Sequence, residues 1–118
     1  MKHFPIFISV EGRRIIVSGG QEAALAKLRL LLKTTASITV YAQNVHKDII
    51  LLADKGKIKL VNRPLARGDA ICATLFYGAN EDSIEDARSA KIAREEGALI
   101  NIVDNLEDSQ FITPAIVD

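Results

Sequence analysis

The apolar residues of the chain fall in short blocks whose spacing switches between that of a strand and that of a helix. The block RIIVS, which ends at Ser18, is short and β-branched, as buried strands are. The next block, over residues 22–33, repeats apolar positions on one helical face, at Ala24, Leu25, Leu28, Leu31 and Leu32. This pattern predicts a strand, a tight turn and a helix that packs on the sheet.

The same alternation continues through most of the chain. Further strands are predicted over residues 37–42, 58–62, 70–77 and 98–103. Further helices are predicted over residues 45–55 and 81–96, the second capped by Asn80 and carrying the stripe Ile84, Ala87, Ala90 and Ala93. Strands and helices in alternation favour an α/β fold with a largely parallel, five-stranded sheet flanked by helices.

Both ends of the chain carry further apolar segments. PIFISV precedes RIIVS with only Glu11, Gly12 and Arg13 between them, which predicts an amino-terminal hairpin strand feeding the first main strand. At the other end, FITPAIVD is a segment of the kind that usually continues into further structure. We therefore expect residues 1–118 to be a single domain and a fragment of a longer protein.

Composition narrows the classes of function. The 15 Lys and Arg balance the 15 Asp and Glu and are scattered, so no surface for nucleic acid or an anionic membrane is indicated. No apolar run approaches the roughly 20 residues of a membrane helix, and MKHFPIFISV lacks the features of a signal peptide. The single cysteine, Cys72, excludes an internal disulfide and fits a reducing compartment. We expect a cytoplasmic domain without nucleic-acid or membrane partners.

A pair of glycines joins the first predicted strand to the first predicted helix, which is how a dinucleotide-binding turn begins. Such a turn needs glycine for its bend, for the approach of the pyrophosphate and, often replaced by alanine, for helix packing. Counted from Gly19, these positions hold Gly19, Gln21 and Ala24; counted from Ser18, they hold Ser18, Gly20 and Ala23. Each register meets two of the three needs, and the helix amino terminus still offers N–H groups to a phosphate. A compact turn without any ligand is an equal alternative.

A second group of candidates is expected at the same edge of the sheet. In an open α/β sheet ligands bind beyond the carboxyl ends of the strands, where Gly19, Gln43, residues 78–80 and Asp104 should converge. A carboxylate at this edge is placed for proton transfer, whereas the alternative for Asp104 is a turn residue that hydrogen-bonds the backbone of residues 105–107. The acid that usually meets the ribose is absent, because residues 41–44 read YAQN.

The remaining reactive side chains indicate structure rather than chemistry. His3 and His46 lie far apart and outside any ligand-spaced cluster, so both are expected at the surface and no metal site is expected. Cys72 falls within a predicted strand, which indicates a buried, inert thiol. The charges of the last predicted helix indicate a solvated surface: Glu81, Asp82, Glu85, Asp86, Arg88, Lys91, Arg94, Glu95 and Glu96.

Taken together, several stretches of the chain resemble one family. PIFISVEGRRIIVSGGQEAALAKLRLLL, ITVYA and, above all, NIVD followed by FITPAIVD are similar to the amino-terminal domain of siroheme synthases. That family comprises the precorrin-2 dehydrogenase and sirohydrochlorin ferrochelatase enzymes, and the resemblance covers the whole chain. It implies a Rossmann-like fold that binds NAD, and an enzyme of porphyrin biosynthesis that oxidises the tetrapyrrole precorrin-2 to sirohydrochlorin and then inserts ferrous iron to make siroheme.

The resemblance also implies roles for particular residues. The family turn usually has a valine, three glycines and an alanine three places later; the matching residues are Ser18, Gly19, Gly20, Gln21 and Ala24, which selects the register that starts at Gly19. The residues implied to lie under the cofactor are Gly19, Gly20, Gln21, Glu22 and Ala23, and Gln43 and Asn44 would meet its adenosine end. Asp104 matches the family's general acid or base. A carboxylate beside the cofactor suits that role, because loss of hydride must be coupled to loss of a proton.

Two departures from the family pattern bear on function. Gln21 replaces a glycine, so its side chain is expected to crowd the pyrophosphate and lower the affinity for NAD. Family members also continue into a dimerisation region and a helical domain, so the full-length protein is expected to be a homodimer and the fragment to turn over little substrate alone. Two hypotheses follow: an NAD-dependent precorrin-2 dehydrogenase and ferrochelatase, and a non-catalytic Rossmann-like nucleotide-binding or regulatory module.

Overall fold

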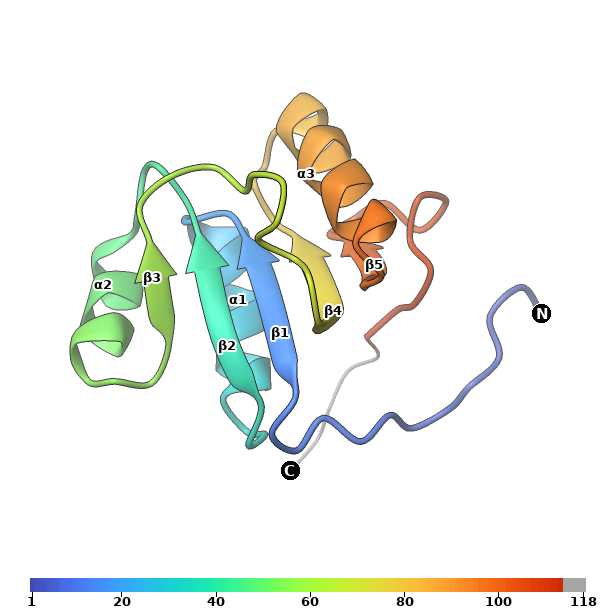
Figure 1. Ribbon diagram of the computed structural model, residues 1–118, viewed down its shortest axis with the longest axis horizontal. Coiled ribbons are helices and arrows are strands. Elements are labelled where there is room, and N and C mark those ends of the chain that lie inside the picture. Colours follow the sequence, from blue (N-terminus) through green and yellow to red (C-terminus); the bar gives the residue numbers. More distant parts are fainter. Residues whose placement is uncertain (114–118) are drawn as a thin grey trace.

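The structure is a computed structural model, and it describes residues 1–113 (Figure 1). The strands within this range are β1 (Arg14–Ser18), β2 (Ser37–Tyr41), β3 (Lys59–Val61), β4 (Ala73–Gly78) and β5 (Leu99–Ile102). The helices are α1 (Glu22–Leu31), α2 (Lys47–Asp54) and α3 (Ser83–Glu95). Every strand pairing is parallel, in the order β3-β2-β1-β4-β5, which confirms the predicted α/β fold with its five-stranded sheet.

The helices cover both faces of this sheet. α1 and α2 pack on one face, where Leu28 and Ile49 join Ile15 of β1 in a single core. α3 packs on the opposite face, where Ala90 joins Phe76 of β4 in a second core. Strand β1 lies at the centre and is buried from both sides, so its sequence is a continuous apolar run rather than an alternation. No helix in the described part of the chain is long and apolar enough to cross a membrane.

The two longest helices differ in how well their apolar stripes predict burial. In α1 the buried residues are Ala24, Leu25, Leu28 and Leu31, as the spacing predicts. In α3 the stripe is wrong at Ile84 and Ala87, which are exposed, because a repeat of three drifts around a helix of 3.6 residues per turn. The predicted cap of α3 is also wrong, since Asp82 rather than Asn80 accepts hydrogen bonds from the first N–H groups of the helix.

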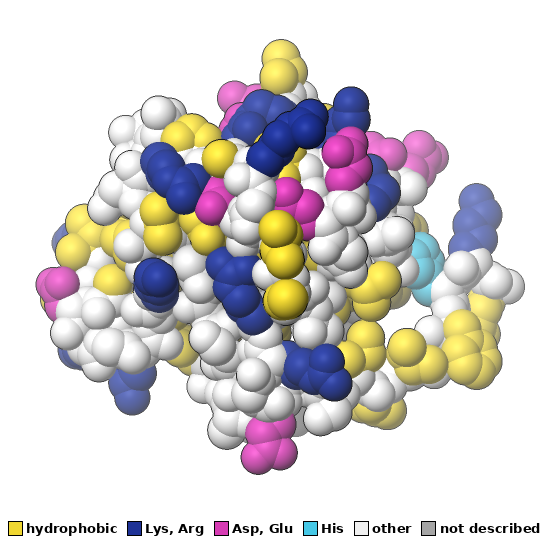
Figure 2. All heavy atoms as spheres, viewed as in Figure 1, with side chains coloured by type: hydrophobic (Ala, Val, Ile, Leu, Met, Phe, Trp, Pro, Cys, Tyr) yellow, Lys and Arg dark blue, Asp and Glu magenta, His cyan; other side chains and the backbone are white. Residues whose placement is uncertain are grey.

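The predicted amino-terminal hairpin strand is wrong. Residues 1–10 contain no strand and run as an extended arm, and a turn closed by the Arg13 N–H on the Val10 carbonyl leads into β1 (Figure 1). Both edges of β1 are occupied by parallel partners, β2 and β4, so no edge is left for a hairpin. The arm exposes Phe4, Ile6 and Phe7, and its apolar side chains stand apart from the body in Figure 2.

The strand predicted over residues 70–77 begins three residues later, at Ala73. Cys72 therefore precedes the strand, in a turn with a left-handed φ of 66°, and it is exposed. The prediction of a buried thiol is wrong, because the apolar run AICATLFY includes a turn as well as a strand.

The chain between β3 and β4 forms a tethered loop, residues 62–72, which we call the 62–72 loop. An ion pair joins Arg63 to Asp69 within it, with 2.6 Å between Nη1 and Oδ2. The Arg63 guanidinium also lies over the Tyr41 ring, 5.4 Å from its centroid. These contacts hold the loop against the sheet.

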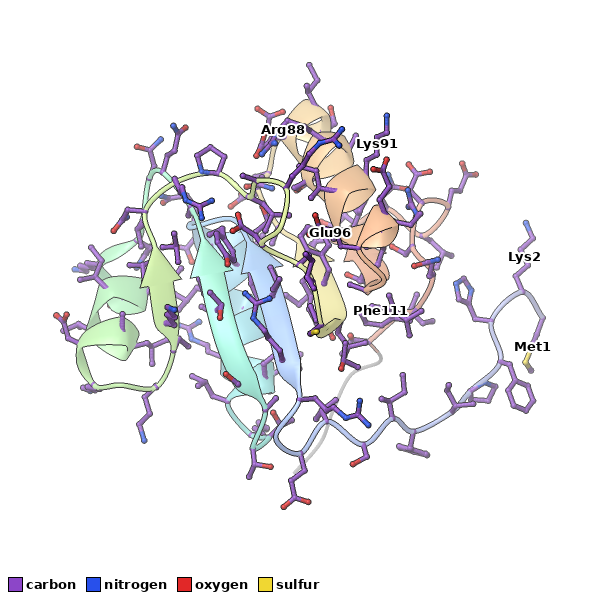
Figure 3. The ribbon with its side chains drawn as sticks, in the orientation of Figure 1. Met1, Lys2, Arg88, Lys91, Glu96 and Phe111 are labelled. Carbon is purple, nitrogen blue, oxygen red and sulfur yellow. The ribbon has the colours of Figure 1, made fainter. Side chains whose placement is uncertain are left out.

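Helix α3 supplies the outer attachments of the 62–72 loop. The Glu96 carboxylate, at the end of α3 in Figure 3, accepts hydrogen bonds from the N–H groups of Gly68 and Ala70. Arg88 donates to the Leu65 carbonyl at 2.7 Å. The loop therefore closes one face of the sheet without secondary structure of its own.

The segment after β5 returns along that strand. Ser109 Oγ accepts from the Ile102 N–H at 2.9 Å, and the Gln110 N–H donates to the Ile100 carbonyl at 2.7 Å. Phe111, labelled in Figure 3, then packs edge-to-face on Tyr77 with 5.3 Å between ring centroids. The rest of FITPAIVD, from residue 114 onward, lies outside the described residues.

Candidate functional site

Three loops meet at the carboxyl edge of the sheet. The loop after β4 is held to β1 by the Ala79 N–H on the Ser18 carbonyl at 2.8 Å, next to the glycine turn. The loop after β5 is held to β4 by the Val103 N–H on the Gly78 carbonyl at 2.9 Å. The structure thus brings together three of the four loops in which the sequence places its candidates.

The two glycines of the turn are required by the packing of these loops. Gly19 has a φ of 136°, and a Cβ there would lie 2.0 Å from the Ala79 carbonyl oxygen. A Cβ on Gly20 would lie 2.2 Å from the Asn44 carbonyl oxygen. Glycine therefore lets the backbone of both neighbouring loops approach the turn, which fixes its shape with or without a ligand.

The loop between β2 and α2 is fastened to this turn. The His46 N–H donates to the Gly20 carbonyl at 2.7 Å, and the Gln21 side chain donates to the Asn44 carbonyl at 2.9 Å. Gln43 is exposed beside these contacts. The Gln21 side chain is thus hydrogen-bonded to the loop in which the adenosine-side candidates lie.

His46 has a structural role that the sequence did not indicate. Its Nδ1 accepts from the Asp48 N–H and so caps α2. Its Nε2 lies 3.2 Å from the Glu22 carboxylate of α1. The prediction of a plain surface histidine is wrong here, since the ring is half-buried between two helix starts.

The amino terminus of α1 opens at the same edge. Its N-cap, Gln21, makes no side-chain capping bond. The Ala23 N–H donates to the carboxylate of Glu81, 3.3 Å away in the loop after β4. The N–H groups of Glu22 and Ala24 have no hydrogen-bond partner among residues 1–113. Unpaired N–H groups at a helix start, together with the helix dipole, favour an anion.

A pocket of about 400 Å³ lies between the start of α3 and the loop after β5. Its lining residues include no Lys or Arg but five carboxylates: Glu81, Asp82, Asp86, Asp104 and Asp108. We call this the acidic pocket. Within the described part of the chain, no His, Cys, Asp or Glu group of three or more is arranged to hold a metal ion.

Asp104 enters the acidic pocket from a left-handed backbone position, with a φ of 61°. Its carboxylate is exposed and makes no hydrogen bond to residues 1–113. The turn is stabilised instead by Asn105, whose side-chain amide nitrogen donates to the Asp108 carboxylate and whose amide oxygen accepts from the Asp108 N–H. Asp104 lies in the turn, but its side chain does not make the hydrogen bonds to the backbone of residues 105–107 that were its alternative, so its oxygens are available to a ligand.

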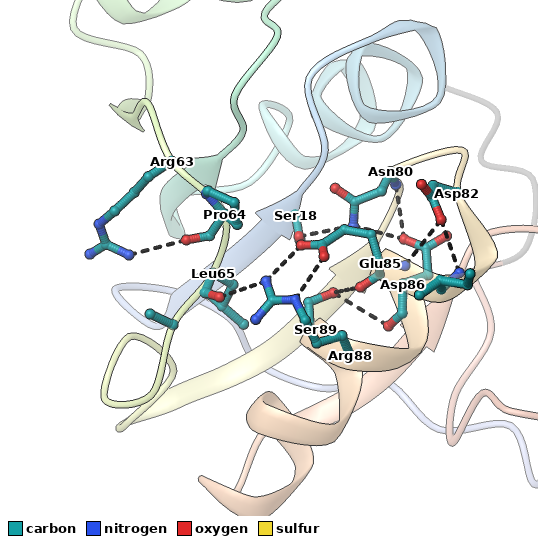
Figure 4. Close-up of polar contacts among 12 residues, drawn as sticks. Ser18, Arg63, Pro64, Leu65, Asn80, Asp82, Glu85, Asp86, Arg88 and Ser89 are labelled. Carbon is teal, nitrogen blue, oxygen red and sulfur yellow. Dashed lines mark hydrogen bonds and ion pairs between the residues drawn. The ribbon is translucent and has the colours of Figure 1, made fainter.

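Asp86 is the buried member of the acidic pocket. One of its oxygens accepts from both the N–H and the side-chain amide of Asn80, each at 2.9 Å, and Asn80 also donates to Ser18 Oγ (Figure 4). Burial raises the pKa of the Asp86 carboxyl, and the hydrogen bonds from Asn80 oppose this shift. The prediction of a solvated charge is wrong for Asp86, since only 7% of it is exposed.

Sequence reasoning placed Asn80 at this edge but missed Glu81 and Asp86 as members of it. Glu81 and Asp86 belong to a run of charges in which spacing alone cannot separate the buried face from the exposed one. A usable signal was the Asn80 position itself, two residues after the end of β4 and two residues before the true cap. A polar side chain there is placed to bridge β1 and α3.

The donor groups at this edge fit the phosphates of a dinucleotide. The α1 dipole and the unpaired N–H groups of Glu22 and Ala24 favour an anion, and the side chain of Gln21 is held by the neighbouring loop. A parallel α/β sheet with a glycine turn leading into such a helix start defines a Rossmann-like nucleotide-binding domain.

Comparison with known proteins gives the family. A family model described as "Putative NAD(P)-binding" matches residues 6–115, and the chain belongs to that family. A solved structure named "SirC, precorrin-2 dehydrogenase" superimposes with a TM-score of 0.83 at 23% identity, covering 96% of this chain and 55% of that one. This likeness agrees with the fold.

Curated relatives align with the whole chain. They include proteins named siroheme synthase from Pseudoalteromonas atlantica, 38% identical over 118 residues, and Methylococcus capsulatus, 36% identical over 118 residues. The chain covers 26% and 25% of these two relatives. It thus spans about a quarter of the length of the curated relatives it matches.

Proposed function

We propose that this chain is the NAD-binding domain of a siroheme-forming enzyme, which oxidises precorrin-2 to sirohydrochlorin with NAD. The observation that carries the proposal is the alignment of all 118 residues with proteins named siroheme synthase. The helix start of α1 supports it, because its N–H groups suit the cofactor pyrophosphate. NAD supplies the hydride acceptor when bound, and this chain supplies the surface that holds it.

In this proposal the residues around the turn hold the cofactor. Gly19 and Gly20 shape the turn, and the backbone of Gln21, Glu22 and Ala23 lies under the pyrophosphate. Gln43 and Asn44 meet the adenosine end, where their amide groups serve in place of the missing ribose-binding acid.

Asp104 is the proposed acid-base residue. Oxidation of a tetrapyrrole by hydride loss also releases a proton, and a carboxylate without other hydrogen bonds is able to accept it. In this proposal the same carboxylate receives pyrrole protons when ferrous iron, a substrate of the full-length enzyme, enters the macrocycle. The full-length enzyme is proposed to act as a homodimer.

The test uses the full-length protein with Asp104→Asn, and with Asp108→Asn as a control that removes the same charge from the same pocket. We expect Asp104→Asn to lower the rate of NADH formation from precorrin-2 by about 100-fold or more, while the affinity for NAD is unchanged. Asp108→Asn should retain most of the rate. Full activity in Asp104→Asn would remove Asp104 from this role.

The second candidate function is a nucleotide-binding or regulatory module without catalysis. It is favoured by Glu81, whose carboxylate takes one N–H group at the start of α1. A full-length protein that binds NAD but forms no NADH with precorrin-2 fits only this second function.

A further inference from the structure

The loop after β4 places a carboxylate at the start of α1. Glu81 Oε2 lies 3.3 Å from the Ala23 nitrogen, although the two residues are 58 positions apart. No other hydrogen bond or ion pair of this carboxylate occurs within residues 1–113. Glu81 thus makes a single polar contact, with the group that the proposed function assigns to a phosphate.

We infer that Glu81 is an internal competitor of the cofactor phosphate and sets the affinity for the dinucleotide. The inference rests on the proposed function. A carboxylate at a helix start satisfies an N–H group and the helix dipole in the same way as a phosphate oxygen does. A pyrophosphate that binds there must displace the carboxylate or lie beside its charge, and both lower its affinity.

The other acids near this helix start are engaged elsewhere. Glu22 pairs with His46 at 3.2 Å, on the side of the β2–α2 loop. Asp82 accepts from the N–H groups at the start of α3. Of these three acids, Glu81 is therefore the one whose polar contact is only with α1.

The backbone of Glu81 makes a clean test possible. Its φ of 57° is left-handed, a conformation that glycine adopts without the cost borne by a residue with a Cβ. Glu81→Gly should therefore fold and remove the carboxylate. Glu81→Gln keeps the length of the side chain and removes only its charge. Glu11→Gln is the matched control, because it removes one negative charge before β1, at the opposite edge of the sheet.

The first experiment is a calorimetric titration of the 118-residue chain and these three variants with NAD. We expect Glu81→Gly to bind roughly fivefold to tenfold more tightly than the unmodified chain, Glu81→Gln to lie between them, and Glu11→Gln to match the unmodified chain. Equal affinity in all four proteins overturns the inference and leaves the proposed function intact.

The second experiment separates failure of the inference from failure of the proposed function. The Ala23 amide resonance is followed by NMR during titration with inorganic pyrophosphate. The inference requires this resonance to differ between the unmodified chain and Glu81→Gly before titration, and to saturate at a lower pyrophosphate concentration in Glu81→Gly. If no protein binds NAD, the proposed cofactor site fails, and this resonance still decides on Glu81. Identical titrations, or no response in either protein, overturn the inference.

Discussion

The 62–72 loop and the acidic pocket both contain several charged side chains, but a carboxylate is paired with a cation only in the loop. In the loop, Asp69 pairs with Arg63, and two backbone N–H groups donate hydrogen bonds to the carboxylate of Glu96 at the end of α3. In the acidic pocket, five carboxylates meet without a Lys or Arg in the lining, and none of them takes part in an ion pair among residues 1–113. Figure 4 shows parts of both regions: Arg63, Pro64 and Leu65 of the loop, and Asp82 and Asp86 of the acidic pocket.

The difference separates carboxylates that are paired with a cation from carboxylates that have no cation beside them. The Arg63 guanidinium holds the pKa of the Asp69 carboxyl below its usual value, so ionisation of Asp69 stabilises the fold. Burial raises the pKa of Asp86, so ionisation of Asp86 costs stability. A buried carboxylate whose ionisation costs stability, at the edge where ligands bind in parallel sheets, is expected where function requires it.

The largest effect should come from replacing a glycine at the sheet edge where the acidic pocket lies, compared with replacing a glycine in the 62–72 loop. Gly20→Ala puts a methyl group 2.2 Å from the Asn44 carbonyl oxygen, so we expect a loss of about 3 kcal/mol or more in the free energy of unfolding. Gly68→Ala in the loop meets nothing within 4 Å and bears only the cost of its φ of 92°, about 1–2 kcal/mol. Urea unfolding followed by circular dichroism measures both, and equal losses would contradict the comparison.

The next effect concerns the paired carboxylate. Asp69→Asn should lower the free energy of unfolding at pH 7 by about 1 kcal/mol, because the ion pair with Arg63 is partly exposed. Since the folded pKa of Asp69 lies below its ordinary value of 3.8, its contribution is present above 3.8 and is lost as the pH falls through the folded pKa. Urea unfolding at a series of pH values should therefore show the two proteins converging in acid. A difference that grows in acid would refute this assignment.

Asp86 should behave with the opposite sign. Its folded pKa is raised above 3.8, so its contribution is fully present below 3.8 and is lost as the pH rises through the folded pKa. Asp86→Asn keeps an oxygen for the Asn80 donors, and we expect its stability at pH 7 to change by less than about 1 kcal/mol. The same pH series should show the unmodified chain gaining stability over Asp86→Asn as the pH is lowered. Parallel curves would mean that Asp86 titrates normally.

The smallest effect concerns the left-handed residues Cys72 and Glu81, one in each region. Glycine at either position should raise the free energy of unfolding by about 0.5–1 kcal/mol, because it relieves the backbone. Only Glu81→Gly should also change the affinity for NAD. Thermal unfolding of both variants with and without NAD tests this difference, because NAD should raise the unfolding temperature more in Glu81→Gly than in the Cys72 variant. An equal rise in both variants would contradict the prediction.

The sequence predicted the sheet because its signals are local. The stripe of α1 and the apolar run of β1 depend on spacing within one element, and both are confirmed. The hairpin failed because the edges of β1 are taken by strands that lie far away in the sequence. The prediction that Cys72 is buried in a strand failed because the sequence alone does not distinguish an apolar residue in a turn from one in a strand.

The site was predicted in outline only, because its members come from separate loops. The carboxyl edge follows from the parallel topology, and Asp104 could be placed there from its position after a strand. The contact of Glu81 with Ala23 joins the loop after β4 to the start of α1, and the buried Asp86 carboxylate is hydrogen-bonded by Asn80 from that same loop. Neither contact can be predicted from the spacing of these residues in the sequence.

The central position of β1 also has a consequence for biogenesis. As the chain leaves the ribosome, β1, β2 and β3 are able to pair early, but the other edge of β1 stays open until β4 has been synthesised. During that interval the nascent protein presents one edge of its apolar central strand with unpaired backbone groups, which favours association between neighbouring nascent chains. Slower translation of residues 19–72 should therefore lower the yield of folded protein.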